Sequence, residues 1–270
     1  MMELVDTHCH LDFPDYEGDT AGPVARAAEA GVRRMVTIGT TLETSETAVR
    51  IAERHPEVYA AVGVHPSDLE TIGPDTWDRL AALARHPRVV GWGECGLDYY
   101  RNHSPREVQL RRFREQVELA AAARLPLLVH DRDAHDDVLA VLRESPATGR
   151  GGTAPRGIIH CFSGDLPFAK SCVDLGFLIS IPGIVTFRNA GGLREVVAAL
   201  PLDALVVETD APFLAPEPYR GKRNEPAYVV HTARRVAEVM GLPEETVAEA
   251  TTRAAAAVYG FDGRRPGGAA

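Results

Sequence analysis

The stretch Val5-Asp6-Thr7-His8-Cys9-His10 reads as a short strand that ends in a His-x-His pair. Side chains on a strand alternate between its two faces, so His8 and His10 are expected to point the same way and Cys9 the other way. Two imidazoles on one face at a strand end make half of a divalent-metal site. Most strand histidines are surface or core residues, so this interpretation depends on further ligands at other strand ends.

Apolar, β-branched runs recur along the chain, and segments with helical periodicity such as Arg106–Arg124 lie between them. The runs are almost continuously apolar, which is typical of parallel strands buried on both faces. Eight strands that alternate with helices predict an α/β fold, the (β/α)8 TIM barrel, whose usual length is about 250 residues. A doubly wound open sheet is the main alternative, but no Gly-x-Gly-x-x-Gly turn follows the first strand. The predicted strands are Leu4–His8, Arg34–Ile38, Tyr59–Val64, Val89–Gly93, Pro126–His130, Gly157–His160, Phe177–Ile181 and Ala204–Glu208.

No repeat or linker divides the chain, so we expect one barrel domain over residues 1–261. Two closing helices are predicted over Glu225–Met240 and Pro243–Tyr259, and the second is additional to the barrel. The segment Ser145–Arg156 is rich in Gly, Pro, Ser and Thr and is expected to be a loop on the amino-terminal rim, away from the usual active-site face. Residues 262–270 are expected to be a disordered tail.

The composition is that of an ordinary globular protein, with 45% hydrophobic and 25% charged residues. No signal peptide or membrane-spanning run is recognisable, and four cysteines without C-x-x-C spacing fit a reducing cytoplasm. A net charge of −9 argues against a general nucleic-acid coating protein, which would carry a broad basic surface. It does not exclude an enzyme that meets a phosphate at one small site.

Histidines and acids follow the apolar runs of five other predicted strands. In a barrel these strand ends converge on one mouth, so residues far apart in sequence become neighbours. Imidazole and carboxylate ligands suit Zn²⁺, Mn²⁺, Fe²⁺ or Mg²⁺ in open hydrolytic sites, and such a set can hold two ions with one carboxylate, most simply Glu94, between them. Together with His8 and His10, the candidates are His65, Glu94, His130, His160, Glu208 and Asp210.

Three of the four cysteines stand beside a candidate ligand. Strand alternation turns Cys9, Cys95 and Cys161 away from the mouth, toward the helix layer, where a free cysteine is a small buried hydrophobe. Cys172 lies in a helix-like segment and is expected in the core. Thiolate ligation of a structural zinc is the competing interpretation, and the cysteines lack its spacing.

Cations gather in the loops that follow the strands, on the predicted mouth face. Positive charge there, on an acidic protein, indicates an anionic substrate, although surface arginines are common in a chain with few lysines. The aromatic residues Tyr99, Tyr100, Phe162 and Phe187 flank the same loops and would either stack on a base or pack the loops. The cations are Arg101, Arg132, Arg188, Arg220, Lys222 and Arg223.

Taken together, these segments are similar to those of one known family. The segments are Asp6-Thr7-His8-Cys9-His10, Gly93-Glu94-Cys95-Gly96-Leu97-Asp98-Tyr99-Tyr100, His130-Asp131-Arg132-Asp133-Ala134, His160-Cys161-Phe162-Ser163-Gly164, and Glu208-Thr209-Asp210-Ala211-Pro212-Phe213-Leu214 with Arg220-Gly221-Lys222-Arg223-Asn224-Glu225-Pro226. In this order and over nearly the whole chain, they resemble the TatD family of metal-dependent deoxyribonucleases.

The resemblance implies a TIM-barrel hydrolase of the amidohydrolase-like superfamily that binds two divalent ions (Mg²⁺, Mn²⁺ or Zn²⁺). It implies that one ion is held by His8, His10, Glu94 and Asp210, and the other by Glu94, His130 and His160. The implied activity is 3′-to-5′ exonuclease action on DNA. Where family members often have Ser or Thr, this chain has Asp131, which could alter substrate affinity or metal choice.

The expected reaction is attack on a phosphodiester by a water that the two ions activate. Glu94, Asp210 and Glu208 are the expected catalytic residues: Asp210 orients the water or accepts its proton, and Glu208 acts from behind the ligands. Arg132, Arg220 and Arg223 would hold the phosphate oxygens. His65 would contact the substrate or a third metal, or be a loop histidine with satisfied hydrogen bonds.

The expected substrate is DNA, as single strands or 3′ ends, and the expected protein is a cytoplasmic monomer that binds no membrane. Two rival functions stay open on the same residues. One is a hydrolase of C–N or C–O bonds, such as a deaminase, amidase or lactonase, against which the cationic loops argue mildly. The other is a metal-bound or DNA-binding protein without turnover.

Overall fold

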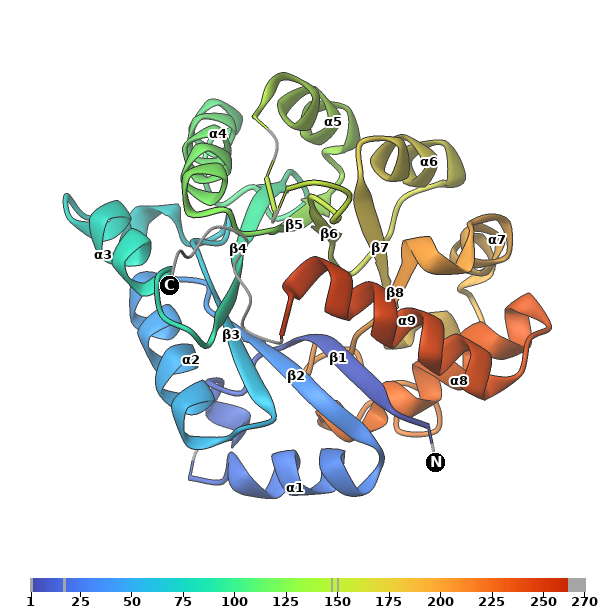
Figure 1. Ribbon diagram of the computed structural model, residues 1–270. Coiled ribbons are helices and arrows are strands. Elements are labelled where there is room, and N and C mark those ends of the chain that lie inside the picture. Colours follow the sequence, from blue (N-terminus) through green and yellow to red (C-terminus); the bar gives the residue numbers. More distant parts are fainter. Residues whose placement is uncertain (1, 17, 147, 150, 262–270) are drawn as a thin grey trace.

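The computed structural model describes residues 2–16, 18–146, 148–149 and 151–261. Eight parallel strands pair in sequence order, each with the next, and helices surround them (Figure 1). The predicted (β/α)8 barrel is therefore confirmed. The strands are β1 (Leu4–Cys9), β2 (Val32–Ile38), β3 (Val58–Val62), β4 (Val89–Asp98), β5 (Leu127–Arg132), β6 (Gly157–Ile159), β7 (Phe177–Ile181) and β8 (Leu205–Val207).

The barrel closes where the end of β1 meets the segment that follows β8. Cys9 forms an isolated parallel bridge with Ala211. The amide of Asp210 donates to the carbonyl of His8 at 2.9 Å, and the amide of His10 donates to the carbonyl of Ala211 at 2.7 Å. Closure therefore places the first and last ligand segments side by side, although 200 residues of sequence separate them.

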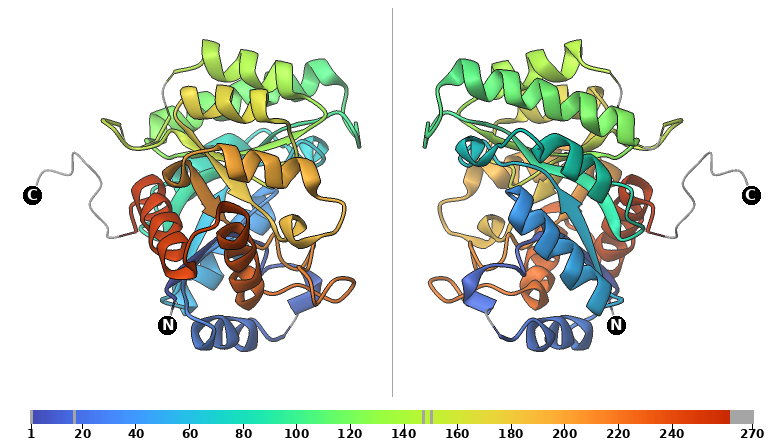
Figure 2. Two further views of the ribbon diagram at one scale, coloured as in Figure 1. Left: turned by 90° about the vertical axis from the view of Figure 1, so that its right-hand side faces the viewer. Right: turned by 90° about the vertical axis from the view of Figure 1, so that its left-hand side faces the viewer.

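Helices form the outer layer, as the two side views in Figure 2 show. Alternating apolar and polar faces explain this layer, because each helix buries one stripe against the strands. The helices are α1 (Ala21–Glu29), α2 (Leu42–Arg54), α3 (Thr76–Leu83), α4 (Arg106–Ala123), α5 (His135–Glu144), α6 (Leu166–Asp174), α7 (Gly191–Ala199), α8 (Val229–Met240) and α9 (Glu244–Tyr259). Short 3-10 turns lie at η1 (Pro14–Tyr16), η2 (Leu69–Thr71), η3 (Gly183–Thr186), η4 (Leu202–Ala204) and η5 (Pro226–Tyr228).

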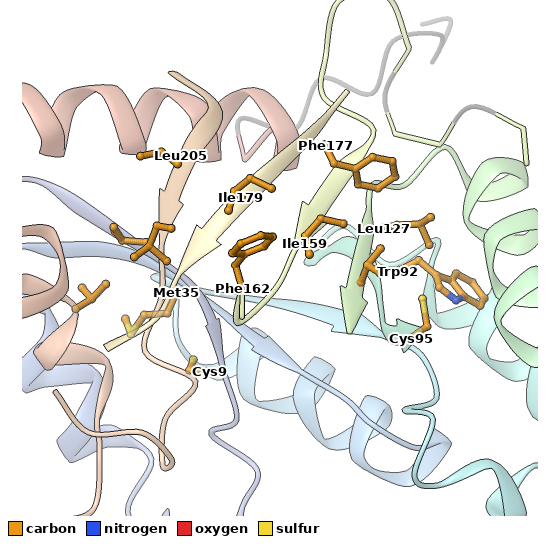
Figure 3. Packing of buried hydrophobic residues seen from close by; sticks show 14 of the residues in the cluster. Cys9, Met35, Trp92, Cys95, Leu127, Ile159, Phe162, Phe177, Ile179 and Leu205 are labelled. Carbon is orange, nitrogen blue, oxygen red and sulfur yellow. The ribbon is translucent and has the colours of Figure 1, made fainter. Parts of the chain in front are cut away.

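The larger part of the core lies between the outer faces of the strands and the helices. Trp92, Phe177 and Ile179 are fully buried in this layer (Figure 3). The indole of Trp92 points outward to α4, where its Nε1 donates to the side-chain oxygen of Gln116 at 3.3 Å. Burial of such apolar side chains is the main stabilising term of the fold, at about 25 cal/mol per Å².

A second, smaller core fills the inside of the barrel. The last helix, α9, closes the amino-terminal end of this core with Ala254, Val258 and Tyr259. Thr252 of α9 donates to the carbonyl of Glu3, just before β1, and the Tyr259 hydroxyl donates to the carbonyl of Thr7 at 2.8 Å. The interior of the barrel is thus filled by side chains, and the mouth lies at the carboxyl-terminal end, opposite α9. Each strand contributes to this smaller core: Val5, Val36, Ala61, Val90, Leu128, Ile158, Leu178 and Val206.

Most predicted boundaries differ from the observed ones by one or two residues, but the fourth strand differs more. The prediction ended this strand at Gly93, whereas β4 continues to Asp98. Gly93, the predicted end, and Gly96 both lie inside the strand, with φ of +144° and +146°. A Cβ on Gly96 would overlap the carbonyl oxygen of His130 in β5, so glycine is there to let two backbones approach.

Three other expectations concern the ends of elements. The closing helix expected from Glu225 begins at Val229, after the η5 turn. The expected loop Ser145–Arg156 contains no helix or strand among its described residues, and Arg156 ties it to the body through the carbonyls of Leu142 and Leu175. The expected disordered tail, 262–270, lies outside the described residues. Among the described helices, none combines the length and apolar character that a membrane crossing requires.

Replacement of Gly96 by alanine tests the close approach of β4 and β5. Strained backbone of this kind costs on the order of 1–3 kcal/mol, and overlap with the His130 carbonyl adds to that cost. We expect Gly96→Ala to lower the free energy of unfolding by about 2 kcal/mol or more in urea titrations. Gly192→Ala, in the first turn of α7 with nothing near its Cβ, is the control and should be neutral or slightly stabilising. Equal effects of the two substitutions would contradict the explanation.

Candidate metal centre

Seven of the predicted site residues meet at the carboxyl-terminal mouth of the barrel. They come from or directly follow five of the eight strands and the β3–α3 loop. All are largely buried: the exposed fraction of the side chain is 15% for His130 and lower for the others. The residues are His8, His10, His65, Glu94, His130, His160 and Asp210.

The carboxylate of Glu94 lies at the centre and divides its two oxygens between two groups of histidines. Oε2 is 3.3 Å from Nε2 of His8 and 3.7 Å from Nε2 of His10. Oε1 is 2.8 Å from Nδ1 of His130 and 3.4 Å from Nε2 of His160. A carboxylate in this arrangement can be shared by two cations, one on each side.

Asp210 completes the group around His8 and His10. Its Oδ1 is 3.4 Å from Nε2 of His10 and 3.9 Å from Nε2 of His8, and one ligand atom from each of the three lies within 4.8 Å of the others. Asp210 has a φ of +54°, a conformation that turns its side chain into the mouth just after β8 ends. His8 and His10 point the same way, as strand alternation predicted.

Three of the histidines are held by a hydrogen-bond acceptor on the side away from Glu94 or Asp210. Nδ1 of His10 is 3.0 Å from the carbonyl of Ile38, Nδ1 of His160 is 3.1 Å from Glu208, and Nε2 of His130 is 3.2 Å from Asp98. An acceptor at one ring nitrogen fixes the proton there and leaves a lone pair on the other, as in most metal-binding histidines. The donor set therefore fits divalent cations.

His65 has the opposite polarity. Its Nδ1 accepts a hydrogen bond from the amide of Ser67 at 3.0 Å, so in the neutral ring the proton is on Nε2. That Nε2 is 3.5 Å from Oε1 of Glu94. His65 is thus set up to donate a hydrogen bond into the site, although its position beside Glu94 and His130 would otherwise suit a ligand.

Glu208 lies behind the histidines, fully buried. Its Oε1 accepts from the amide of Cys161 at 2.8 Å, and its Oε2 accepts from the hydroxyl of Ser180 and lies near Nδ1 of His160. Both oxygens are occupied by the protein, so Glu208 orients His160 and the turn after β6.

Buried charges shape the electrostatics of the site. Burial opposes the charged form of His160, but Glu208 and Glu94 raise its pKa to about 10. Burial also opposes the charged form of His10, but Asp210 and Glu94 raise its pKa to about 9. Burial and the nearby His130 lower the pKa of His65 to about 3, so this imidazole is neutral. Burial disfavours the anion of Glu94, yet the surrounding histidines hold its pKa well below the usual range.

Two carboxylates that were not among the predicted site residues support the site. Asp98 orients His130. Asp98 lies four residues after Glu94 on the same strand, and because alternate residues share a face, the two side chains point to the same side. Alternation would have identified it had β4 been extended past Gly93. Asp6 accepts from the amide of Thr209 at 2.9 Å and from its hydroxyl at 2.6 Å, which fixes the segment that carries Asp210. Burial raises the pKa of Asp6 to about 8.

The cysteine prediction is correct for three residues and wrong for one. Cys9, Cys95 and Cys172 are buried among apolar side chains of the outer core. Cys161, however, is partly exposed, and its Sγ lies within 4.8 Å of ligand atoms of His160 and Asp210. It follows the end of β6 with a φ of +45°, so strand alternation no longer determines its direction.

The predicted cations lie on the rim around the cluster, and each of the three expected to bind phosphate covers an aromatic ring. Arg132 lies 4.2 Å from the ring centroid of Tyr100, and Arg220 lies 4.3 Å from that of Phe187. Arg223 lies 5.2 Å from the ring of Tyr16 and donates to the carbonyl of Asp15. In the part of the chain that the structure describes, none of the three forms an ion pair with the ligand acids.

The aromatic candidates divide into packing residues and surface residues. Phe162 is 1% exposed and belongs to the core, and the Tyr99 hydroxyl donates to Asp137. Tyr100 is 67% exposed, and a further ring, Phe213, is 43% exposed beside His10. Tyr100 and Phe213 are therefore the most exposed of these rings, and Phe187 is partly exposed.

Asp131, which the family resemblance marked as a departure, faces away from the mouth. Its carboxylate pairs with Nδ1 of His135 in α5, and His135 stacks on Phe168 of α6. Within the described residues, no hydrogen bond or ion pair joins its side chain to the cluster. Its position gives it a packing role between β5 and the helices.

Comparison with known proteins agrees with these observations. The family described as "TatD related DNase" matches residues 5–260. A Bacillus subtilis (strain 168) protein named "Uncharacterized metal-dependent hydrolase YabD" is 40% identical over 95% of this chain and 98% of its own. A Salmonella typhimurium protein named "3′-5′ ssDNA/RNA exonuclease TatD" is 38% identical over 87% of this chain and 90% of its own. The crystal structure of a TatD homologue from Escherichia coli K12, YJJV, superposes with a TM-score of 0.88, at 32% identity, over 95% of this chain and 98% of that one.

Proton competition predicts how metal binding depends on pH. His10 and His160 have pKa values of about 9 and about 10 without a metal, above the ordinary value of 6.5, so both stay protonated at neutral pH and lose their protons only as the pH rises through those values. A cation must displace these protons. We expect the affinity of the metal-free protein for Zn²⁺ or Mn²⁺ to increase from pH 6.5 to pH 9. Calorimetry at pH 7 in buffers of different ionisation enthalpy should show net proton release. Unchanged affinity over this range, without proton release, would be inconsistent with the geometry.

Proposed function

This chain belongs to the family of TatD-related DNases and is a metal-dependent hydrolase that acts on ester bonds, and from that premise we propose that it removes nucleotides from the 3′ end of single-stranded DNA with two divalent ions. The observation that carries the proposal is the division of the Glu94 carboxylate between two groups of histidines. The exonuclease name of the Salmonella relative and the arginines on the rim support a nucleic-acid substrate.

The proposed ligands form two sets that share Glu94. His8, His10 and Asp210 would hold one ion with Oε2 of Glu94, and His130 and His160 would hold the other with Oε1. Mg²⁺, Mn²⁺ and Zn²⁺ all accept imidazole and carboxylate ligands in such sites. The chemistry supplied by bound divalent ions is Lewis acidity, which acidifies water and withdraws charge from a phosphate.

Asp210 is the acid best placed to accept a proton from the attacking water. Its side chain is 13% exposed, compared with 5% for Glu94 and none for Glu208, so it is the most accessible of the three expected catalytic acids. Glu208 is saturated by hydrogen bonds from the protein and serves to position His160. Glu94 stays anionic among the histidines, so its role is to hold charge at the centre rather than to transfer protons.

His65 would donate its Nε2 proton to a phosphate oxygen. Because Nδ1 already accepts from Ser67, the ring can donate into the site without a change of tautomer. Charge that develops on the phosphate oxygens would strengthen such a hydrogen bond. This role accounts for a neutral, buried imidazole in the middle of a ligand cluster.

Arg132, Arg220 and Arg223 are proposed to hold the phosphates of the strand. The stacking of Arg132 on Tyr100 and of Arg220 on Phe187 presents a guanidinium and a ring together, a combination that suits a phosphate and its base. Arg132 is close enough to the mouth for its charge to act on Cys161.

Substitution of the central carboxylate tests the proposed reaction. With single-stranded DNA labelled at its 5′ end, the wild-type protein should produce a ladder that shortens from the 3′ end, and Glu94→Ala should abolish it and lower metal content. Glu144→Ala, an exposed position on α5, is the control and should behave as wild type. Neutral lactones and amides assayed in parallel separate the rival hydrolase functions. Activity retained in Glu94→Ala, or hydrolysis of those substrates but of no phosphodiester, would reject the proposal.

Substitution of His65 separates hydrogen-bond donation from ligation. We expect His65→Ala to lower kcat by about 10²-fold, the usual effect of losing one such donor, while metal content and unfolding midpoint stay near wild type. His160→Ala is the comparison, because loss of a ligand should reduce metal content together with activity. A His65→Ala protein that loses metal as His160→Ala does would show that His65 is a ligand.

A further inference from the structure

An open cleft lies beside the barrel mouth, outside the metal centre. It lies between the segment after η3, α7, the β8–α8 loop and α8, and has a volume of about 460 Å³, within the range of small-ligand sites. Thr186 and Arg188 form its end at the rim, and Arg234 and Glu238 extend it along α8. Of the residues that line it, Phe187 was proposed above to meet the substrate, and the others were given no part in the reaction.

The cleft concentrates positive charge on an otherwise acidic protein. Four arginines, Arg188, Arg194, Arg234 and Arg235, line it against two glutamates, in a chain of net charge −9. Arg234 and Arg235 are each paired with a glutamate, whereas the rim end holds Arg188 and Arg194 against Glu217 alone and so keeps a net positive charge. Among the described residues, the exposed guanidinium of Arg188 has no hydrogen-bond or ion-pair partner.

The backbone at the rim end is held rigid. The guanidinium of Arg194 donates to the carbonyls of Val185, Phe187 and Arg188 at 2.7–3.2 Å. The hydroxyl of Thr186 accepts from the amide of Glu217 in the β8–α8 loop at 2.9 Å. Carbonyl oxygens carry no formal charge, so these hydrogen bonds fix the loop and do not balance the positive charge of Arg194. A ligand would therefore meet a site that is already ordered, which reduces the entropy cost of binding.

Aromatic rings lie along the same surface. Phe187 lines the cleft and lies under Arg220. Tyr219 and Tyr228 stack with ring centroids 4.1 Å apart, and His231, which lines the cleft, meets Tyr219 edge-on. Guanidinium groups interspersed with rings are characteristic of surfaces that bind single-stranded nucleic acid without reading its sequence.

The β8–α8 loop connects this cleft to the metal centre. The loop follows β8 and carries Asp210, then the exposed ring of Phe213 beside His10. Further on it carries Glu217, which lines the cleft, and Arg220, which covers the cleft residue Phe187. A strand that leaves the cluster along this loop would pass Phe213 and the Arg220–Phe187 pair, and Phe187 is next to Arg188 in the cleft lining. The β8–α8 loop therefore carries residues of both the candidate metal centre and the cleft.

We propose that this cleft binds the sugar–phosphate backbone of single-stranded nucleic acid several nucleotides upstream, on the 5′ side, of the bond that is cleaved. The inference rests on the proposed exonuclease function and adds a second contact region for the same substrate. Arg188 supplies the unpaired charge for a phosphate, and the aromatic wall supplies stacking. The enzyme consequently favours strands long enough to reach from the metal centre to Arg188.

Charge reversal at Arg188 tests the proposal in a binding assay that does not depend on hydrolysis. Fluorescence anisotropy with metal-free protein in EDTA compares a short oligothymidine of about 3 nucleotides with a long one of about 15. We expect Arg188→Glu to weaken binding of the long strand about 10-fold and to reduce the slope of log K against log salt by about 0.7, the value for one phosphate contact on a single strand. Binding of the short strand, and its hydrolysis once metal is restored, should stay unchanged.

Arg85→Glu is the matched control, because Arg85 is equally exposed and precedes β4, at the opposite end of the barrel. An equal loss in Arg85→Glu and Arg188→Glu, or equal weakening of short and long strands by Arg188→Glu, would overturn this inference while the exonuclease activity stands. A wild-type protein that neither binds nor cleaves any single strand would overturn the proposed function and this inference together.

Discussion

One buried carboxylate organises the molecule: Glu94, held 5% exposed among histidines at the mouth of the barrel. A carboxylate without partners would be too costly to bury, since desolvation of a charge exceeds what most packing can offset. His8, His130 and His160, from three different strands, supply the partners, and the closed ring of strands brings them to it. The histidines that stabilise this buried anion also surround it where two cations could share it. The same contacts therefore serve both the stability of the fold and the chemistry of the site.

The histidines around Glu94 look alike in sequence but differ in what holds them from behind. In the neutral rings, carbonyl or carboxylate acceptors hold the proton of His10, His130 and His160 on the outer nitrogen and leave the inner nitrogen able to bind a metal, whereas the amide of Ser67 fixes His65 with a proton toward the site. The outer partner, more than the position of the ring, therefore decides whether an imidazole can bind a metal or donate to a substrate. The site contains both kinds within a few ångströms.

Much of this arrangement could be predicted from the sequence, because parallel strands in a closed barrel bring their carboxyl ends together whatever the details of each strand. The convergence of His8, Glu94, His130, His160 and Asp210 follows from that topology alone. The orientation of Cys161 could not be predicted, because it lies past the end of β6 in a positive-φ conformation. The role of Asp98 was hidden by two glycines that normally end strands but here permit close contact with β5.

The arrangement of the smaller core has a consequence for synthesis. The apolar side chains inside the barrel are covered at the amino-terminal end by α9, the last helix that the structure describes. While the chain grows on the ribosome, the interior therefore stays open to water after all eight strands exist, and it is sealed only when Tyr259 reaches Thr7. Nascent chains that stall before this helix expose a ring of Val, Ile and Leu side chains, the kind of surface that chaperones bind and that aggregates.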